Sequence, residues 1–247
     1  MPLVPADSPL LKVPTALDRR TVLYLDGIRY SMHIFDIAFE RFTATIQRLS
    51  NERQEPGTLA HSIAEAFGDA WLLVDAAHRL RELVQQLPGL KQKQPTIQLF
   101  LRRTAPIEDL RHFVQHFRSG IDTHVQTGHP LWGTLSWTRT NPTTGDPENF
   151  TIAPGTFFDG AIVPMCTFDS LEFRFVQRVK LQVGSLSVDL ANVYDQVAEF
   201  AAWYTDWFSA AHPNGPHHGA DFRTCFVIKR LASPPSANEP TPPPSEA

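Results

Sequence analysis

The sequence predicts an α+β protein, a helical bundle of three long helices and a C-terminal helix, with an antiparallel β-sheet inserted between the third and fourth helices. Two observations lead to this class. Apolar residues recur with a helical period over most of the first half of the chain. After residue 130, apolar and polar residues alternate within short segments that are separated by turn-forming clusters. A helical period returns near residue 190.

The first two helices are predicted from long apolar stripes. Residues 21–50 place apolar side chains on one helical face, at Leu25, Ile28, Met32, Phe35, Phe39, Phe42, Ile46 and Leu49. The group NERQEPG ends this helix. The second helix begins near Thr58, and Pro88 and Gly89 close it.

The third helix is expected to begin at Pro106, because proline suits the first position of a helix. Glu108 and Asp109 follow in the first turn, where carboxylates interact favourably with the helix dipole. The helix is expected to run to about Gly128. The preceding segment TIQLFLRRT, residues 96–104, fits either a strand or a helical turn.

The second half predicts a small antiparallel sheet followed by one helix. LWGTLSWTRT alternates in polarity, NPTTGDPEN is a turn cluster, and LEFRFVQRVKLQV supplies further alternating positions. Asp189 can cap the last helix. That helix carries an apolar and aromatic stripe at Leu190, Val193, Tyr194, Val197, Phe200, Ala201, Tyr204, Trp207 and Phe208.

These elements divide the chain into six parts. They are a flexible N-terminus at 1–20, the bundle at 21–129, the β insertion at 130–186, a helix completing the bundle at 187–213, a returning strand at 222–232, and a disordered Pro-rich tail at 233–247.

Composition narrows the classes of function. The formal net charge of −4 gives the whole chain no electrostatic attraction to nucleic acid, so any such binding needs a local basic patch. Two cysteines are too few for a disulfide framework or a zinc site. No apolar run approaches the length of a membrane span, and no secretory signal is visible. We therefore expect a cytoplasmic protein without a metal or cofactor.

The stretch IEDLRHFVQHFRSGIDTHV, residues 107–125, concentrates histidine and arginine on one predicted helix. Its apolar residues share a face, while His112 and His116 lie on the opposite side and Arg111 and Arg118 line one flank. The first interpretation is that of an ordinary amphipathic core helix, whose polar residues lie on its solvent-exposed face. A metal site is a second interpretation, because two histidines four residues apart on one face can bind the same metal ion. However, Phe113 stands where metalloproteases have Glu, and no third ligand is evident.

The third interpretation is a resemblance. LRHFVQH places Arg111, a polar residue and three further residues before His116, which is similar to the Arg–polar–three–His signature of the HEPN superfamily of helical-bundle domains. The likeness covers about residues 20–128 and the later helix. It implies a dimeric bundle. Active members of the family are metal-independent endoribonucleases, often bacterial toxins paired with an antitoxin or acting in antiphage defence. Other members are inactive and bind RNA or nucleotides.

The resemblance also implies roles for individual residues. His116 would take a proton from a ribose 2′-hydroxyl or give one to the leaving oxygen, and Arg111 would hold the phosphate. His112 fills the polar slot, where the family more often has Asn. Residues five apart point about 140° away from each other on a regular helix, so Arg111 and His116 converge only through a distorted helix or a two-fold dimer.

Other residues suggest supporting roles and an alternative. Arg102 and Arg103 precede the same helix and, with Arg118, are candidate substrate-binding residues. Trp132 and Trp137 fit either base stacking or an inward core position. Asp75 and His78 are neighbours on the second helix and are expected to form an internal polar pair. The alternative function is a non-catalytic interaction or ligand-binding module that uses the β region and the aromatic last helix.

Overall fold

The computed structural model describes most of the chain. The residues it describes are 2–51, 56–90, 93–118, 121, 125, 128–155, 164–169, 172 and 174–213. The predicted returning strand and Pro-rich tail lie outside these residues, as does part of the predicted third helix.

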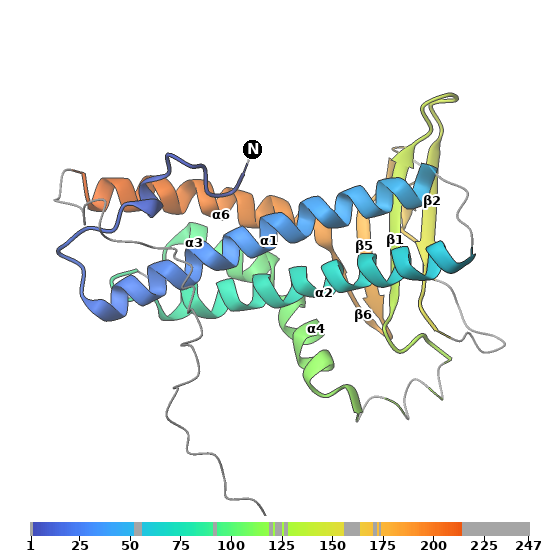
Figure 1. Cartoon of the computed structure of the whole chain (residues 1–247), viewed down its shortest axis with the longest axis horizontal. Helices are drawn as coiled ribbons and strands as arrows, with labels where there is room; N and C mark the ends of the chain where they lie inside the picture. Colours follow the sequence, from blue (N-terminus) through green and yellow to red (C-terminus); the bar gives the residue numbers. More distant parts are fainter. Residues whose placement is uncertain are drawn as a thin grey trace, which may run out of the picture.

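Two long helices form the frame of the molecule. Helix α1 (Arg19–Asn51) and helix α2 (Pro56–Gln86) run side by side in opposite directions (Figure 1). The predicted stripe of α1 is largely buried, and α2 contributes buried Phe67, Leu73, Leu80 and Val84 opposite it. The apolar periodicity therefore predicted both helices and the faces that form the core. None of the helices in the described residues is long and apolar enough to cross a membrane.

The last helix, α6 (Leu190–Ala211), packs along the other two, and its aromatic stripe lies in the core. Phe200, Tyr204 and Phe208 are almost completely buried, and the rings of Phe100 and Phe200 stack with centroids 4.6 Å apart. This buried face is therefore occupied by the protein's own bundle, rather than being presented to a partner.

A four-stranded antiparallel sheet closes one end of the helices (Figure 1), with the strand order β2-β1-β5-β6. Its strands are β1 (Thr134–Thr140), β2 (Pro147–Ile152), β5 (Val179–Val183) and β6 (Leu186–Asp189), and β3 (Phe168–Asp169) with β4 (Arg174–Phe175) forms a separate hairpin. Leu135 lies opposite Leu181, which lies opposite Val188, and all three are buried. The predicted α+β class, a helical bundle with an antiparallel sheet, is confirmed.

Asp189 joins the sheet to the last helix. It ends β6 and is the N-cap of α6, where its Oδ1 accepts hydrogen bonds from the backbone N–H groups of Ala191 and Asn192. The same carboxylate accepts from the backbone N–H groups of Arg178 and Val179 at the start of β5. The predicted cap is confirmed, and it also anchors a strand.

The third position of the bundle differs from the prediction. It holds two short helices, α3 (Pro95–Arg103) and α4 (Pro106–Gln115), so TIQLFLRRT is helical. Proline lacks a backbone N–H and its ring obstructs the preceding turn, so α3 cannot continue through Pro106. Helix α4 in turn leaves helical geometry at His116, where φ is −109° and ψ is 26°. The expected single helix to about Gly128 is therefore interrupted at His116, and the described residues Phe117, Arg118, Ile121 and Val125 beyond it are helical again.

The N-terminal segment, which we expected to be flexible, packs against the bundle. Leu3 and Leu10 are buried, and the backbone N–H of Leu3 donates to the buried carboxylate of Asp36 over 3.1 Å. The short 3-10 helix η1 (Pro9–Leu11) presents the carbonyl of Leu10 to the buried guanidinium of Arg29. The apolar residues that lie between the prolines pack this segment against the bundle. The high proline content alone had suggested a flexible segment.

Candidate functional site

Helix α4 is attached to the bundle by its N-terminal half. Ile107 and Leu110 are completely buried, and Phe113 packs partly against the core. The helix then projects away from the long axes of α1 and α2 (Figure 1). Its C-terminal turn therefore carries side chains that the core does not cover.

A buried arginine holds the joint between α3 and α4. Arg81 of α2 donates to the carbonyl oxygen of Leu101 and to the hydroxyl of Thr104, and its Nη2 lies 2.6 Å from Glu108 Oε1. Thr104 in turn donates from its hydroxyl to the carbonyl of Phe100. Glu108 is thus paired with Arg81 of the neighbouring helix.

Arg111 is held from α2 by Asp75. The Arg111 Nε lies 2.8 Å from Asp75 Oδ1, and Asp75 Oδ2 accepts a hydrogen bond of 2.7 Å from Arg79 Nε. This hydrogen bond and the charge of Asp75 raise the pKa of Arg79. One carboxylate therefore faces two guanidinium groups, which leaves the trio with one net positive charge.

The contact between Arg111 and Asp75 is an ion pair without a well-aligned hydrogen bond. The Arg111 Nε is out of contact with solvent and makes no hydrogen bond within the described part of the chain. At this nitrogen the two charges are therefore joined by proximity alone. A guanidinium can bind a phosphate through two N–H groups at once.

His112 and His116 lie side by side on the exposed face of α4. Their ring centroids are 4.4 Å apart, with the planes tilted by 50°. The backbone N–H of His116 donates to the carbonyl of His112 over 3.1 Å, which keeps the two residues one turn apart although the helix ends there. The structure therefore brings together the imidazoles that the sequence singled out, next to Arg111 in the chain.

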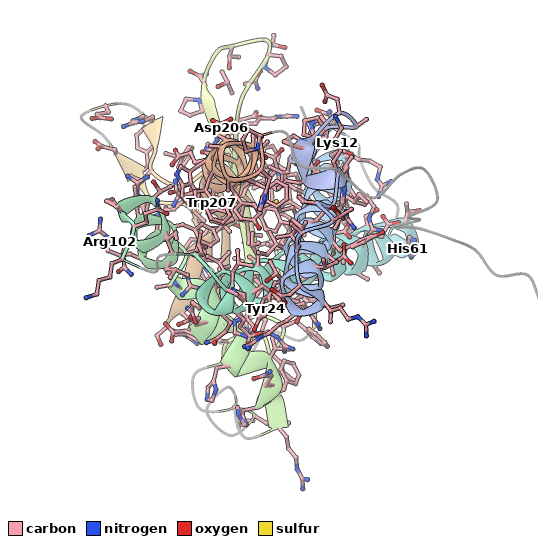
Figure 2. All side chains as sticks on the ribbon, turned by 90° about the vertical axis from the view of Figure 1, so that its left-hand side faces the viewer. Lys12, Tyr24, His61, Arg102, Asp206 and Trp207 are labelled. Atoms are coloured by element: carbon pink, nitrogen blue, oxygen red, sulfur yellow. The ribbon has the colours of Figure 1, made fainter. Side chains whose placement is uncertain are left out.

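The remaining predicted site residues lie elsewhere. Arg102 on α3 points outward at the periphery (Figure 2). Arg103 faces α6, with its Nη1 3.1 Å from Gln196 Oε1 and 3.6 Å from Glu199 Oε2. Arg118 is exposed just beyond α4. Only Arg118 of these three stays close in the chain to the histidine pair.

Two residues that hold the site were missed by sequence reasoning. Asp75 was expected to pair with His78, but His78 Nε2 lies 3.5 Å from Glu82 Oε1 instead. Asp75 and Arg79 stand four residues apart on α2, a spacing that favours their ion pair and could have found it. Nothing in the sequence links Asp75 to Arg111, since they are on different helices.

The two tryptophans of the first strand region have different surroundings. Trp137 is buried, stacks on Phe150 and donates from Nε1 to Ser50 Oγ over 2.7 Å. Trp132 is 48% exposed, and its ring lies 4.9 Å from the ring of Phe117. The inward role is confirmed for Trp137, whereas Trp132 presents an indole beside the end of α4.

The chemistry available at α4 is that of a guanidinium and two imidazoles. Within the described residues, no group of three or more His, Cys, Asp or Glu side chains is placed to hold a metal ion. Imidazole exchanges protons near neutral pH, and a guanidinium binds an oxyanion. Comparisons with protein-family models, curated proteins and solved structures found no match.

Proposed function

We propose that the protein binds RNA at the exposed face of α4 and cleaves it as a metal-independent endoribonuclease of the HEPN-like kind. The single observation that carries this proposal is the His112–His116 pair, with ring centroids 4.4 Å apart, beside a guanidinium that Asp75 orients. RNA supplies both the anion for Arg111 and the 2′-hydroxyl that acid–base chemistry can activate.

The reaction would be an internal transfer at phosphorus. One imidazole takes the proton of the ribose 2′-hydroxyl, whose oxygen forms a bond to phosphorus. The other imidazole gives a proton to the 5′-oxygen as the bond between that oxygen and phosphorus breaks. The products are a 2′,3′-cyclic phosphate and a free 5′-hydroxyl. Arg111 stabilises the charge that grows on the phosphate oxygens.

The test is incubation with single-stranded RNA in the presence of a chelator. We expect cleavage by the native chain and none by His116→Ala, with both proteins melting at the same temperature. His61→Ala is the matched control, because His61 is an exposed histidine of α2 that pairs with Glu65 and lies away from α4 (Figure 2). Cleavage that persists in His116→Ala contradicts the proposal.

We extend the proposal to a homodimer. Helix α1 carries an exposed apolar stripe in which Leu23, Tyr30 and Ile37 are seven residues apart and Ile34 lies between them. Heptad spacing of this kind favours helix–helix association. Light scattering should give the mass of a dimer, and the double variant Ile34→Glu with Ile37→Glu the mass of a monomer. A monomeric native chain at high concentration contradicts this part. The antitoxin-like partner implied by the resemblance stays a prediction.

A non-catalytic interaction module is the second candidate, and one observation favours it. The region of the β3–β4 hairpin exposes Met165, Phe168 and Val176, which is unusual for apolar residues so close together. Most of the stripe of α6 is buried in the bundle, whereas Trp207 is only partly buried and lines a cavity with Phe208 and Ala211. A native chain that leaves RNA intact under all conditions would favour the module.

A further inference from the structure

A cavity of about 290 Å³ lies beside the site described above, and the acid–base chemistry does not use it. Its walls are apolar side chains and one glycine, and the described residues lining it are Ala64, Phe67, Gly68, Trp71, Trp132 and Pro154. A Cβ placed on Gly68 meets no atom within 4 Å, so the space at this residue is open. The volume is close to the lower limit of about 300 Å³ for small-molecule sites.

Helix α2 connects this cavity to Arg111. Trp71 and Asp75 are four residues apart on α2, so their side chains share a face and follow each other by one helical turn. Asp75 holds the Arg111 guanidinium at 2.8 Å. The cavity wall at Trp71 and the carboxylate that pairs with Arg111 are thus separated by about 6 Å along α2.

A second connection runs through the aromatic residues at the end of α4. Phe117 directly follows His116 in the chain, and its ring lies 4.9 Å from the ring of Trp132. Trp132 lines the cavity and is half exposed, so one indole surface is accessible to a ligand. The cavity is therefore linked to the end of α4 through the Phe117–Trp132 contact, and to Asp75, the partner of Arg111, through Trp71 on α2.

We propose that this cavity is a nucleobase subsite, in which a base stacks against Trp132 while the phosphate of the same nucleotide reaches Arg111. The inference rests on the proposed function for the location of the phosphate. Aromatic side chains bind bases through their π-faces regardless of sequence. Because no charged side chain lines the described cavity, recognition depends on stacking area. Purines are therefore bound more tightly than pyrimidines.

Titration calorimetry with adenosine 5′-monophosphate tests this subsite. Trp132→Ala should weaken binding about 5- to 150-fold, the loss expected for one base–aromatic stack. Trp132→Phe should restore most of the affinity. Gly68→Leu, which fills the cavity without changing α4, should also prevent binding. Phe168→Ala is the control, because Phe168 is an exposed aromatic residue of β3 that does not line the cavity. Thermal melts show whether each variant is folded.

The arms of the experiment separate the base from the phosphate. Arg111→Ala should weaken binding of the monophosphate but leave binding of adenosine unchanged. Native affinity in both Trp132→Ala and Gly68→Leu overturns the subsite, as does a native chain that binds no purine nucleotide.

The subsite and the proposed function fail separately. His116→Ala should bind the nucleotide normally while cleaving no RNA. If the native chain binds the nucleotide in this cavity but cleaves nothing, the nuclease proposal fails and the subsite stands. If the chain cleaves RNA and the two cavity variants cleave and bind as well as the native chain, the subsite fails and the nuclease proposal stands.

Discussion

Two reciprocal ion pairs join α2 to α4, and they differ in burial. Arg81 of α2 reaches Glu108 of α4, and Arg111 of α4 reaches Asp75 of α2, with N–O distances of 2.6 Å and 2.8 Å. The Arg81 side chain is 3% exposed, whereas that of Arg111 is 23% exposed. The two pairs thus have the same charges and nearly the same distance, and they differ in how far the arginine is buried.

The difference shows how one helix is both anchored and functional. Arg81 donates to a carbonyl, a hydroxyl and a carboxylate, so its terminal nitrogens are engaged by the protein itself. Arg111 Nε has one ion pair and no aligned hydrogen bond within the described residues, and the Arg111 side chain is partly exposed. The first half of α4 is therefore a structural joint, and the second half carries a partly exposed guanidinium.

The largest expected effect is that of Arg81→Ala. It leaves the Leu101 carbonyl and the buried Thr104 hydroxyl without their donor, and unsatisfied buried groups of this kind together cost about 3 kcal/mol. Urea denaturation should show this loss in the free energy of unfolding. Arg79→Ala is the control, since its side chain is 62% exposed and should cost under about 1 kcal/mol. Equal effects of the two substitutions would contradict the structural role of Arg81.

Double-mutant cycles compare the two pairs directly. We expect a coupling energy of about 1–2 kcal/mol between Arg81 and Glu108, because the Arg81 guanidinium is buried in a hydrogen-bond network even though Glu108 is half exposed. Between Arg111 and Asp75 we expect about 0.5 kcal/mol, since neither side chain is fully buried and their contact lacks an aligned hydrogen bond. A larger coupling for the second pair would reverse the comparison. Denaturant unfolding of all single and double variants provides both values.

Arg111→Ala should change stability little and activity strongly. The free energy of unfolding should fall by less than about 1 kcal/mol. The rate of RNA cleavage should fall by about 10²- to 10³-fold, the cost of losing one donor to the developing negative charge. Parallel measurements of melting and single-turnover cleavage test this. A variant that unfolds readily, or that cleaves like the native chain, removes Arg111 from the proposed site.

The smallest effect is expected at Arg103. The Arg103 side chain is 46% exposed and its ion pair with Glu199 is at the surface, while Gln196 is buried, so Arg103→Ala should change the free energy of unfolding by under about 1 kcal/mol. Because the side chain faces α6, RNA cleavage and binding should stay at native levels. A loss of RNA binding in a filter assay would return Arg103 to the substrate-binding residues that the sequence suggested.

Periodicity predicted the elements whose apolar faces are buried and misjudged the one that leaves the bundle. The stripes of α1, α2 and α6 were found because core packing imposes a regular spacing on long helices. Beyond α4 the apolar pattern continues to Ile121 and Val125, which are helical yet 43% and 65% exposed. The same spacing thus occurred where no core covers it, and it did not reveal the interruption at His116.

The candidate site was partly predictable for a related reason. His112 and His116 are neighbours through local helix geometry, which spacing reveals. The partner of Arg111 is Asp75, which lies in a different helix, and only the packing of α4 against α2 brings them together. The cavity at Trp132 likewise depends on a strand-region loop meeting the middle of α2. Contacts between distant segments leave no periodic trace in a single sequence.

The carboxylate of Asp189 has a consequence for how the chain unfolds. It accepts from backbone groups of both β5 and α6, and no linker separates the strand it ends from the helix it caps. Loosening the sheet would therefore uncap the helix, and fraying of the helix would detach the strand. The sheet and the helical bundle should consequently melt in a single cooperative transition. A fragment ending before residue 189 would lack α6 and could not complete its bundle.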